Sequence, residues 1–223
     1  MLQTNLKANQ VRNTGSMKIL KICITILFFS NAVGELSAQS QRLHLQPGIQ
    51  IGANFASLAS MDHSYEPGIG FIAGLTVEAG YMGRSFSLNS GLKYYRSGVL
   101  RTVENVNTDF VVDYLSIPLT LNYNLNSFGF PGIFFFAGAN MSFLANSEII
   151  FNMGEETVKG DYSDQTNDLL YFLEAGAGSK FQKGNLNMNF RLQFNMSLNE
   201  VYNGDEISGG RSYVVSIIAG IVF

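Results

Sequence analysis

The chain has 223 residues, of which 46% are hydrophobic and 14% charged, and its formal net charge is −3. Soluble domains carry about 25% charged residues, so this composition disfavours a surface made for water, and the acidic balance gives no support to a nucleic-acid partner. The single cysteine, Cys23, excludes a disulfide within the chain.

The first segment has the features of a secretory leader. Residues 17–21 form a short basic region, residues 22–30 form a mostly apolar run, and residues 36–38 offer a small-residue cleavage site. The apolar run is shorter than the roughly 20 residues of a membrane-spanning helix. We therefore predict a signal peptide over residues 1–38 and one β-barrel domain over residues 39–223. Within the first segment we expect translation to start at Met17. Removing the leader leaves ten basic and sixteen acidic residues, a net charge of −6.

Eight segments of the remaining chain alternate apolar and polar residues with the period of two expected of β-strands. Residues 186–198 show it most clearly, with apolar residues at every even position and Asn, Gln, Ser and one Arg between them. Globular strands usually end after about 5–6 residues, whereas a tilted membrane strand needs about 9–11. The segments are 43–55, 67–81, 84–97, 111–124, 132–144, 168–181, 185–198 and 212–223.

This pattern predicts an all-β fold, an eight-stranded antiparallel up-and-down transmembrane β-barrel. Apolar side chains would face lipid and polar ones the lumen. No apolar run after the leader is long enough for a membrane helix, which leaves a closed barrel as the structure that satisfies its backbone inside a bilayer. A soluble lipocalin-like barrel is the rival interpretation, but its water-facing positions would carry many Lys and Glu residues, and neither face does here.

The links between the predicted strands alternate in length. Short links cover 82–83, 125–131 and 182–184, and long ones cover 56–66, 98–110, 145–167 and 199–211. Outer-membrane barrels have short periplasmic turns and long external loops, so we expect the bacterial outer membrane with both termini in the periplasm. Acidic residues concentrate in the long links, which predicts acidic extracellular loops.

Aromatic residues of lipid-facing parity fall near the strand ends, where an interfacial girdle is expected. The periplasmic ring would contain Tyr81, Phe86, Tyr123, Phe181 and Phe223. The outer ring would contain Phe55, Phe71, Tyr94, Phe143, Tyr171 and Tyr213. The last strand ends in phenylalanine, which resembles the signal by which outer-membrane barrels are recognised for insertion.

Several strands resemble those of the Bacteroidota outer-membrane β-barrel proteins often called PorT-like. The most specific stretch is Asp113-Tyr114-Leu115-Ser116-Ile117-Pro118-Leu119, similar to the Tyr-Leu-x-Ile-Pro-Leu strand of that family. The resemblance implies an integral outer-membrane barrel but no single activity. It also rests on residues 48–54, 70–75, 86–94 and 175–178. Proline removes a ladder donor, so we expect a bulge at Pro118.

Four charged residues have lumen-facing parity: Glu78, Lys93, Glu174 and Arg191. Eight strands enclose an interior that side chains fill, where charges must pair or form hydrogen bonds. Because the four charges sum to zero, we expect a structural ion-pair network in which Arg191 is the partner of Glu78 or Glu174. The alternative is a gate that opens by exchanging partners, in which case Arg191→Ala would raise conductance.

Catalytic and metal chemistry have weak support. His44 and His63 are the only candidates for a general base, and neither stands in a recognisable constellation, so we expect no enzyme activity, no catalytic residue and no cofactor. Asp161, Asp164 and Asp168 offer oxygen ligands of the kind calcium takes, but their spacing lacks an EF-hand pattern, and a solvated acidic loop is the favoured interpretation.

Three classes of function remain. The first is a structural or surface-interaction barrel that meets a partner through its loops, the second is a narrow pore for small solutes, and the third is an enzyme acting on outer-membrane lipid. A filled lumen favours the first. The expected partners are outer-membrane lipid and lipopolysaccharide, the barrel-insertion machinery and a surface partner of the loops; we expect a monomer that binds no nucleic acid.

Overall fold

The computed structural model describes residues 43–59, 66–81, 85–103, 106–125, 132–153, 156–184, 186–202 and 210–223. The chain separates into the units Met1–Leu43 and His44–Phe223, and the strands described below form the second. The predicted leader, residues 1–38, lies outside the described ranges. Within these ranges no helix is both long and apolar enough to cross a membrane.

The described chain is almost entirely antiparallel sheet, with one 3-10 turn, η3 (Ser163–Gln165). Nine strands follow in order. They are β1 (Leu43–Ala59), β2 (Glu66–Tyr81), β3 (Phe86–Val103), β4 (Val106–Asn124), β5 (Ile133–Met153), β6 (Glu156–Asp161), β7 (Leu169–Lys183), β8 (Leu186–Ser197) and β9 (Arg211–Val222).

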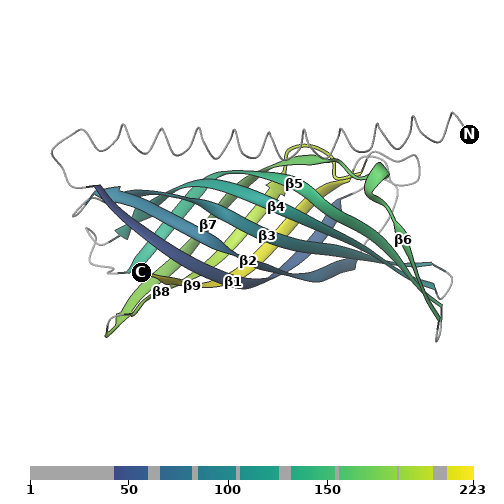
Figure 1. Cartoon of the computed structure of the whole chain (residues 1–223), viewed down its shortest axis with the longest axis horizontal. Coiled ribbons are helices and arrows are strands. Elements are labelled where there is room, and N and C mark those ends of the chain that lie inside the picture. The colour runs from purple at the N-terminus through teal and green to yellow at the C-terminus, as the bar shows by residue number, and fades with distance from the viewer. Residues whose placement is uncertain are drawn as a thin grey trace, which may run out of the picture. The chain divides into compact units, whose positions relative to one another are not determined.

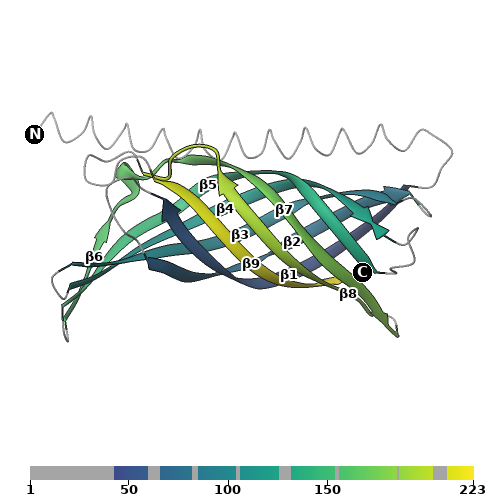
Figure 2. The same cartoon turned by 180° about the vertical axis from the view of Figure 1, so that it is seen from behind.

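Eight of these strands close into a barrel. The sheet runs β4-β3-β2-β1-β9-β8-β7-β5, and β4 also pairs with β5, so the first and last members of the order meet. The seam between β1 and β9 is in register from Gly48↔Val222 to Ala59↔Arg211. Figures 1 and 2 show these strands crossing obliquely on opposite sides of the barrel unit. The predicted eight-stranded antiparallel up-and-down barrel is confirmed.

We call the end where β1 begins and β9 stops the terminus end, and the opposite end the loop end. At the loop end β3, β4 and β5 are longer than the sequence predicts, and the ninth strand, β6, lies there, paired with β5 from Glu148↔Asp161 to Met153↔Glu156 (Figure 1). The expected long links 98–110 and 145–167 are therefore mostly strand. The alternation of apolar and polar residues weakens there, but backbone pairing needs no such alternation.

The predicted bulge at Pro118 is wrong. Pairing between β3 and β4 is interrupted opposite Pro118, but Ser90↔Leu119 and Lys93↔Ser116 hold the same register. The proline lacks only a donor, and its carbonyl accepts a 2.8 Å hydrogen bond from the Ser90 hydroxyl. The register shift lies elsewhere on β4, between Asp113 and Tyr114 on the side that faces β5.

Burial follows the alternation along the barrel strands. In β8 every odd position from Asn189 to Ser197 is buried, while Phe190, Leu192 and Phe194 on the other face are exposed. The same inversion holds in β5, where Phe134 and Phe136 are buried and Phe135 is exposed. The outer face of the barrel is therefore apolar and the inner face filled, the arrangement expected of a barrel surrounded by lipid.

Candidate functional site

The lumen contains the charged residues that the sequence singles out, and it changes character along its length. Toward the terminus end it is lined by buried polar side chains, and toward the loop end by a buried apolar cluster. The side chains of Glu78, Lys93, Glu174 and Arg191 are all in the polar part, each 6% exposed or less.

Lys93 and Glu174 approach each other across the lumen. The Lys93 Nζ lies 3.8 Å from Oε1 of Glu174. The same carboxylate oxygen accepts hydrogen bonds of 3.0 Å from the amide groups of Asn140 and Gln193. Amide donors from two further strands thus hold the carboxylate in place, which a buried charge requires.

Glu78 has a different partner from the one the sequence suggests. Its Oε1 accepts hydrogen bonds from the Ser87 hydroxyl and from Nζ of Lys180, which joins β2 to β7. Sequence reasoning missed Lys180, although it shares the even-numbered, lumen-facing parity of Glu174 on the same strand. Its place near the end of β7 obscured this signal.

Arg191 is held by aromatic rings. Its guanidinium carbon lies 5.4 Å from the ring centroids of both Phe134 and Phe136. No ion pair within 4.0 Å joins Arg191 to Glu78 or Glu174 in the described part of the lumen, and its Nε lacks a hydrogen-bond partner there. Arginine stacks on aromatic faces through its planar cation, so β5 supplies the contacts that we expected from a carboxylate.

Glycines on β7 make this stacking possible. A Cβ atom at Gly176 would overlap the ring of Phe136, and one at Gly178 would overlap the ring of Phe134. Both glycines pair with residues of β5, as in Phe136↔Gly176 and Phe134↔Gly178. The short glycine positions therefore accommodate the rings on which Arg191 rests.

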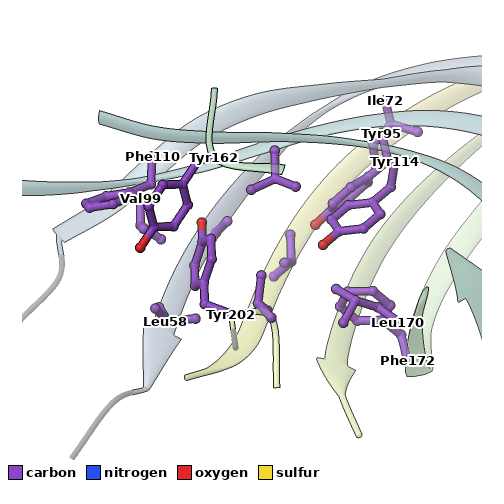
Figure 3. Packing of buried hydrophobic residues seen from close by; sticks show 14 of the residues in the cluster. Leu58, Ile72, Tyr95, Val99, Phe110, Tyr114, Tyr162, Leu170, Phe172 and Tyr202 are labelled. Carbon is purple, nitrogen blue, oxygen red and sulfur yellow. The ribbon is translucent and has the colours of Figure 1, made fainter. Parts of the chain in front are cut away.

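The loop-end half of the lumen is closed by apolar and aromatic side chains, shown in Figure 3. Tyr95 and Tyr114 lie side by side from one wall, and Leu170 and Phe172 lie on the wall that faces them. The cavity that remains among these residues measures about 20 Å³, close to the minimum for one water molecule. The described side chains thus fill most of the space within the cluster.

Two loop segments cover this cluster. Tyr162, after β6, and Tyr202, after β8, lie 5.9 Å apart between ring centroids, and each is about 6 Å from Phe110. Thr166 and Tyr202 form an isolated antiparallel bridge, and the amide of Asn167 donates to the carbonyl of Val201. Sequence reasoning missed this aromatic cap because it joins two links far apart in the chain.

The structure places the predicted interface aromatics on the outside. Phe86 and Tyr123 stack near the terminus end at 4.8 Å, and Phe71 and Tyr94 near the loop end at 5.6 Å. The side chain of Tyr81 lies outside the described residues. Others with exposed side chains are Phe55, Tyr171, Phe181 and Phe223, while Phe143 and Tyr213 are partly exposed.

The remaining candidates do not come together as a site. His44 is exposed at the start of β1, and His63 falls outside the described residues. Asp161, Asp164 and Asp168 are exposed near η3, and the described residues contain no group of three or more His, Cys, Asp or Glu side chains arranged for a metal ion. Asp161 instead caps the turn, since its Oδ1 accepts a 2.9 Å hydrogen bond from the Ser163 amide.

A closed antiparallel barrel with an apolar outer face and a filled lumen defines an integral membrane β-barrel. The chain belongs to the family described as outer membrane protein beta-barrel domain, whose model matches residues 37–203. The protein is therefore a barrel of the bacterial outer membrane, and the soluble lipocalin-like alternative is wrong. No curated protein sequence matches the chain.

Several solved outer-membrane barrels are similar to the chain at low sequence identity. Neisserial surface protein A is 12% identical with a TM-score of 0.48, and the alignment covers 82% of this chain and 100% of that one. Ail of Yersinia pestis is 12% identical with a TM-score of 0.44, covering 81% and 99%. OprG of Pseudomonas aeruginosa is 10% identical with a TM-score of 0.45, covering 83% and 97%.

Proposed function

We propose that the protein is a closed barrel that acts by contact at the cell surface through its loop end. The observation that carries this proposal is the continuation of β3, β4 and β5, with β6, past the loop-end aromatics as a sheet. Its outward face carries the charged side chains of Arg96, Asp109, Asp113 and Glu148 among apolar ones such as Leu100 and Val111, so the charged part of this face suits water and a polar partner. Lipid would not solvate such a face.

The outward face of this sheet is organised by hydrogen bonds. Arg96 donates from Nε and Nη2 to the two carboxylate oxygens of Asp113, each at 2.7 Å. Asn146 donates to Glu148 at 3.1 Å and Asn152 to Asp109 at 3.3 Å. Asp109 and Glu148 thus place carboxylate groups on an ordered surface, which supports a partner that carries positive charge.

In the orientation we propose, the loop end is extracellular and both termini are periplasmic. Because Cys23 falls in the predicted leader, the mature chain would have no thiol. Single cysteines at Lys159 of β6 and at Gln182 of β7 can therefore be compared on intact cells with a membrane-impermeant maleimide. We expect labelling at position 159 only; labelling at position 182 alone would reverse the orientation.

The finer expectations belong to the same proposal. The similarity to PorT-like proteins supports a Bacteroidota source, and the final phenylalanine supports recognition of β9 by the insertion machinery. We propose a monomer in contact with outer-membrane lipid and lipopolysaccharide, without enzymatic activity and without a nucleic-acid partner. A narrow pore is the second candidate, favoured by the polar half of the lumen; the apolar cluster counts against it.

Photocrosslinking on intact cells tests the surface role. A photoreactive residue at Lys159 should give a discrete adduct with a positively charged surface protein, and the adduct should be lost when Asp109 and Glu148 are both changed to lysine. A photoreactive residue at Leu192, on the lipid-facing side of β8, is the matched control. The same adduct from both positions, or an adduct insensitive to the charge reversals, would count against contact through the sheet.

A further inference from the structure

The terminus end of the lumen contains a pocket that neither the surface role nor the closed lumen explains. Its volume is about 200 Å³. It is lined by the start of β1, the last part of β2, the β7–β8 hairpin and the end of β9. Pockets for drug-sized ligands occupy about 300–1,000 Å³, so an occupant must be smaller, of the size of a single sugar ring.

The lining is rich in carboxamides. Gln46, Gln182, Asn187 and Asn189 all contribute to it. A carboxamide both donates and accepts hydrogen bonds, and so does a hydroxyl group. Four such side chains around one small space are therefore suited to a ligand that presents several hydroxyl groups.

One of these carboxamides is incompletely bonded. Asn189 is 6% exposed, and its Oδ1 has no hydrogen-bond partner among the described residues. A buried polar atom without a partner is unfavourable, because it has lost its hydrogen bonds to water. The neighbouring position in the register is Gly220, and the Asn189 amide fills the space that a Cβ there would need, since such a Cβ would lie 2.9 Å from its Oδ1. The floor of the pocket thus contains a buried acceptor that no described residue satisfies.

The charges of the pocket select against an ionic ligand. Glu78 and Lys180 both line it, and they are paired with each other. The two charges cancel, so neither an anion nor a cation would gain a free counter-charge. The apolar side of the lining is formed in part by Val222, and the carbon face of a sugar ring matches such a surface.

We propose that this pocket binds an uncharged monosaccharide ring, through its hydroxyl groups, at the terminus end of the barrel. The ring comes either from a free sugar or from the end of a glycan chain. Both sources present the same chemistry to Asn189 and the other carboxamides. The site is independent of the surface role, because it lies at the opposite end of the barrel.

Saturation-transfer NMR on the full protein in a sugar-free detergent tests the proposal. The probes are glucose, N-acetylglucosamine and its β-1,4-linked dimer, with glycine and methyl phosphate as charged comparisons. We expect saturation of at least one sugar and of neither charged probe. Binding of a monosaccharide alone identifies a free sugar as the ligand, and binding of the dimer through its terminal ring identifies a chain end.

Variants assign the binding to the pocket. Asn189→Ala removes the unpaired acceptor and Gln182→Ala removes a rim carboxamide that is exposed, and each should lower the saturation at least fivefold. Gln165→Ala, an exposed glutamine of η3 at the loop end, is the matched control and should have no effect. Heat-modifiable mobility on gels reports folding of each variant. No saturation of any sugar, equal saturation in Gln182→Ala and the control, or preferential binding of glycine or methyl phosphate would overturn the proposal.

Discussion

The five buried or half-buried charges in the polar part of the lumen are not equivalent. Lys93 and Glu174 form one pair, and Glu78 and Lys180 form another. Arg191 adds a positive charge whose close contacts are rings. The two pairs are balanced without it, so the arginine and the lysine should respond differently to neutralisation.

Replacing Lys93 by methionine should destabilise the barrel by about 3–5 kcal/mol, because it leaves the Glu174 carboxylate without a cation in contact. Arg191→Met should lower the free energy of unfolding by less than about 2 kcal/mol, the range of a desolvated cation–π contact. Urea unfolding in phospholipid vesicles measures both changes. Equal losses in the two variants would contradict the separation of Arg191 from the ion pairs.

Gly178 offers a second test at this scale. Gly178→Ala places a methyl group against the Phe134 ring and the Phe190 carbonyl, and overpacking of this kind typically lowers stability by about 1–3 kcal/mol. Gly184→Ala is the control for overpacking, because a Cβ in the open β7–β8 turn would meet no atom. The φ of 61° at Gly184 adds some backbone strain of its own. A stable Gly178→Ala variant would mean that the ring has room to move.

Among the elements, β5 shows most clearly how the side-chain pattern of a strand changes between its lipid-facing part and its loop-end part. From Ile133 to Phe143 it alternates between lipid and lumen, and beyond the shift opposite Asp113 it continues as part of the loop-end sheet with β4 and β6. Alternation is required only where one face meets lipid. The sequence signal for the strand therefore ends before the strand does.

The turn after β6 should respond to pH through Asp161. Its pKa is lowered because the carboxylate accepts hydrogen bonds from the backbone and side chain of Ser163. A lowered pKa in the folded state stabilises the turn above the unfolded pKa, and this contribution is lost as the pH falls through the folded pKa. We expect faster amide exchange of Ser163 in acid, and in Asp161→Ala at neutral pH. Asp164→Ala in the same turn should leave that exchange unchanged.

Strand identity was predictable because lipid imposes a strict period of two, as in Leu186–Ser197. Inward parity likewise located Glu78, Lys93, Glu174 and Arg191 in the lumen. The actual contacts were not predictable, since Lys180 reaches Glu78 from a strand far along the chain and Arg191 prefers two rings to a carboxylate. The contact between Tyr162 and Tyr202 was also not predictable, because links without a hydrophobic period do not indicate which other segments they contact.

The whole molecule combines a polar vestibule at one end with an apolar closure at the other. The charged part of the lumen therefore ends at Tyr95, Tyr114 and Phe172, whose side chains carry no charge. Conduction of ions would require water to enter a space of about 20 Å³ lined largely by carbon. The closure does not depend on Arg191.

We expect neither the natural protein nor Arg191→Ala to conduct ions in planar lipid bilayers, in contrast to a gate built on Arg191. Replacing Tyr95, Tyr114 and Phe172 together by alanine should produce discrete conductance steps, because the apolar block is then removed. Heat-modifiable mobility on gels shows whether the triple variant is folded. Steady conductance of the natural protein would contradict a closed lumen, and conductance in Arg191→Ala alone would support a gate built on Arg191.

The seam between β1 and β9 also dictates the order of assembly. The partners Gly48 and Val222 stand near opposite ends of the chain, whereas the other ladders of the barrel join strands that follow one another or enclose only β6. Because the entropic cost of closing a loop grows with its length, the pairing between the strands most distant in sequence is expected to form last. Until β9 arrives, the N-terminal strand remains an open edge, and open edges recruit foreign strands. We therefore expect β9 to be the last strand to pair as the barrel closes.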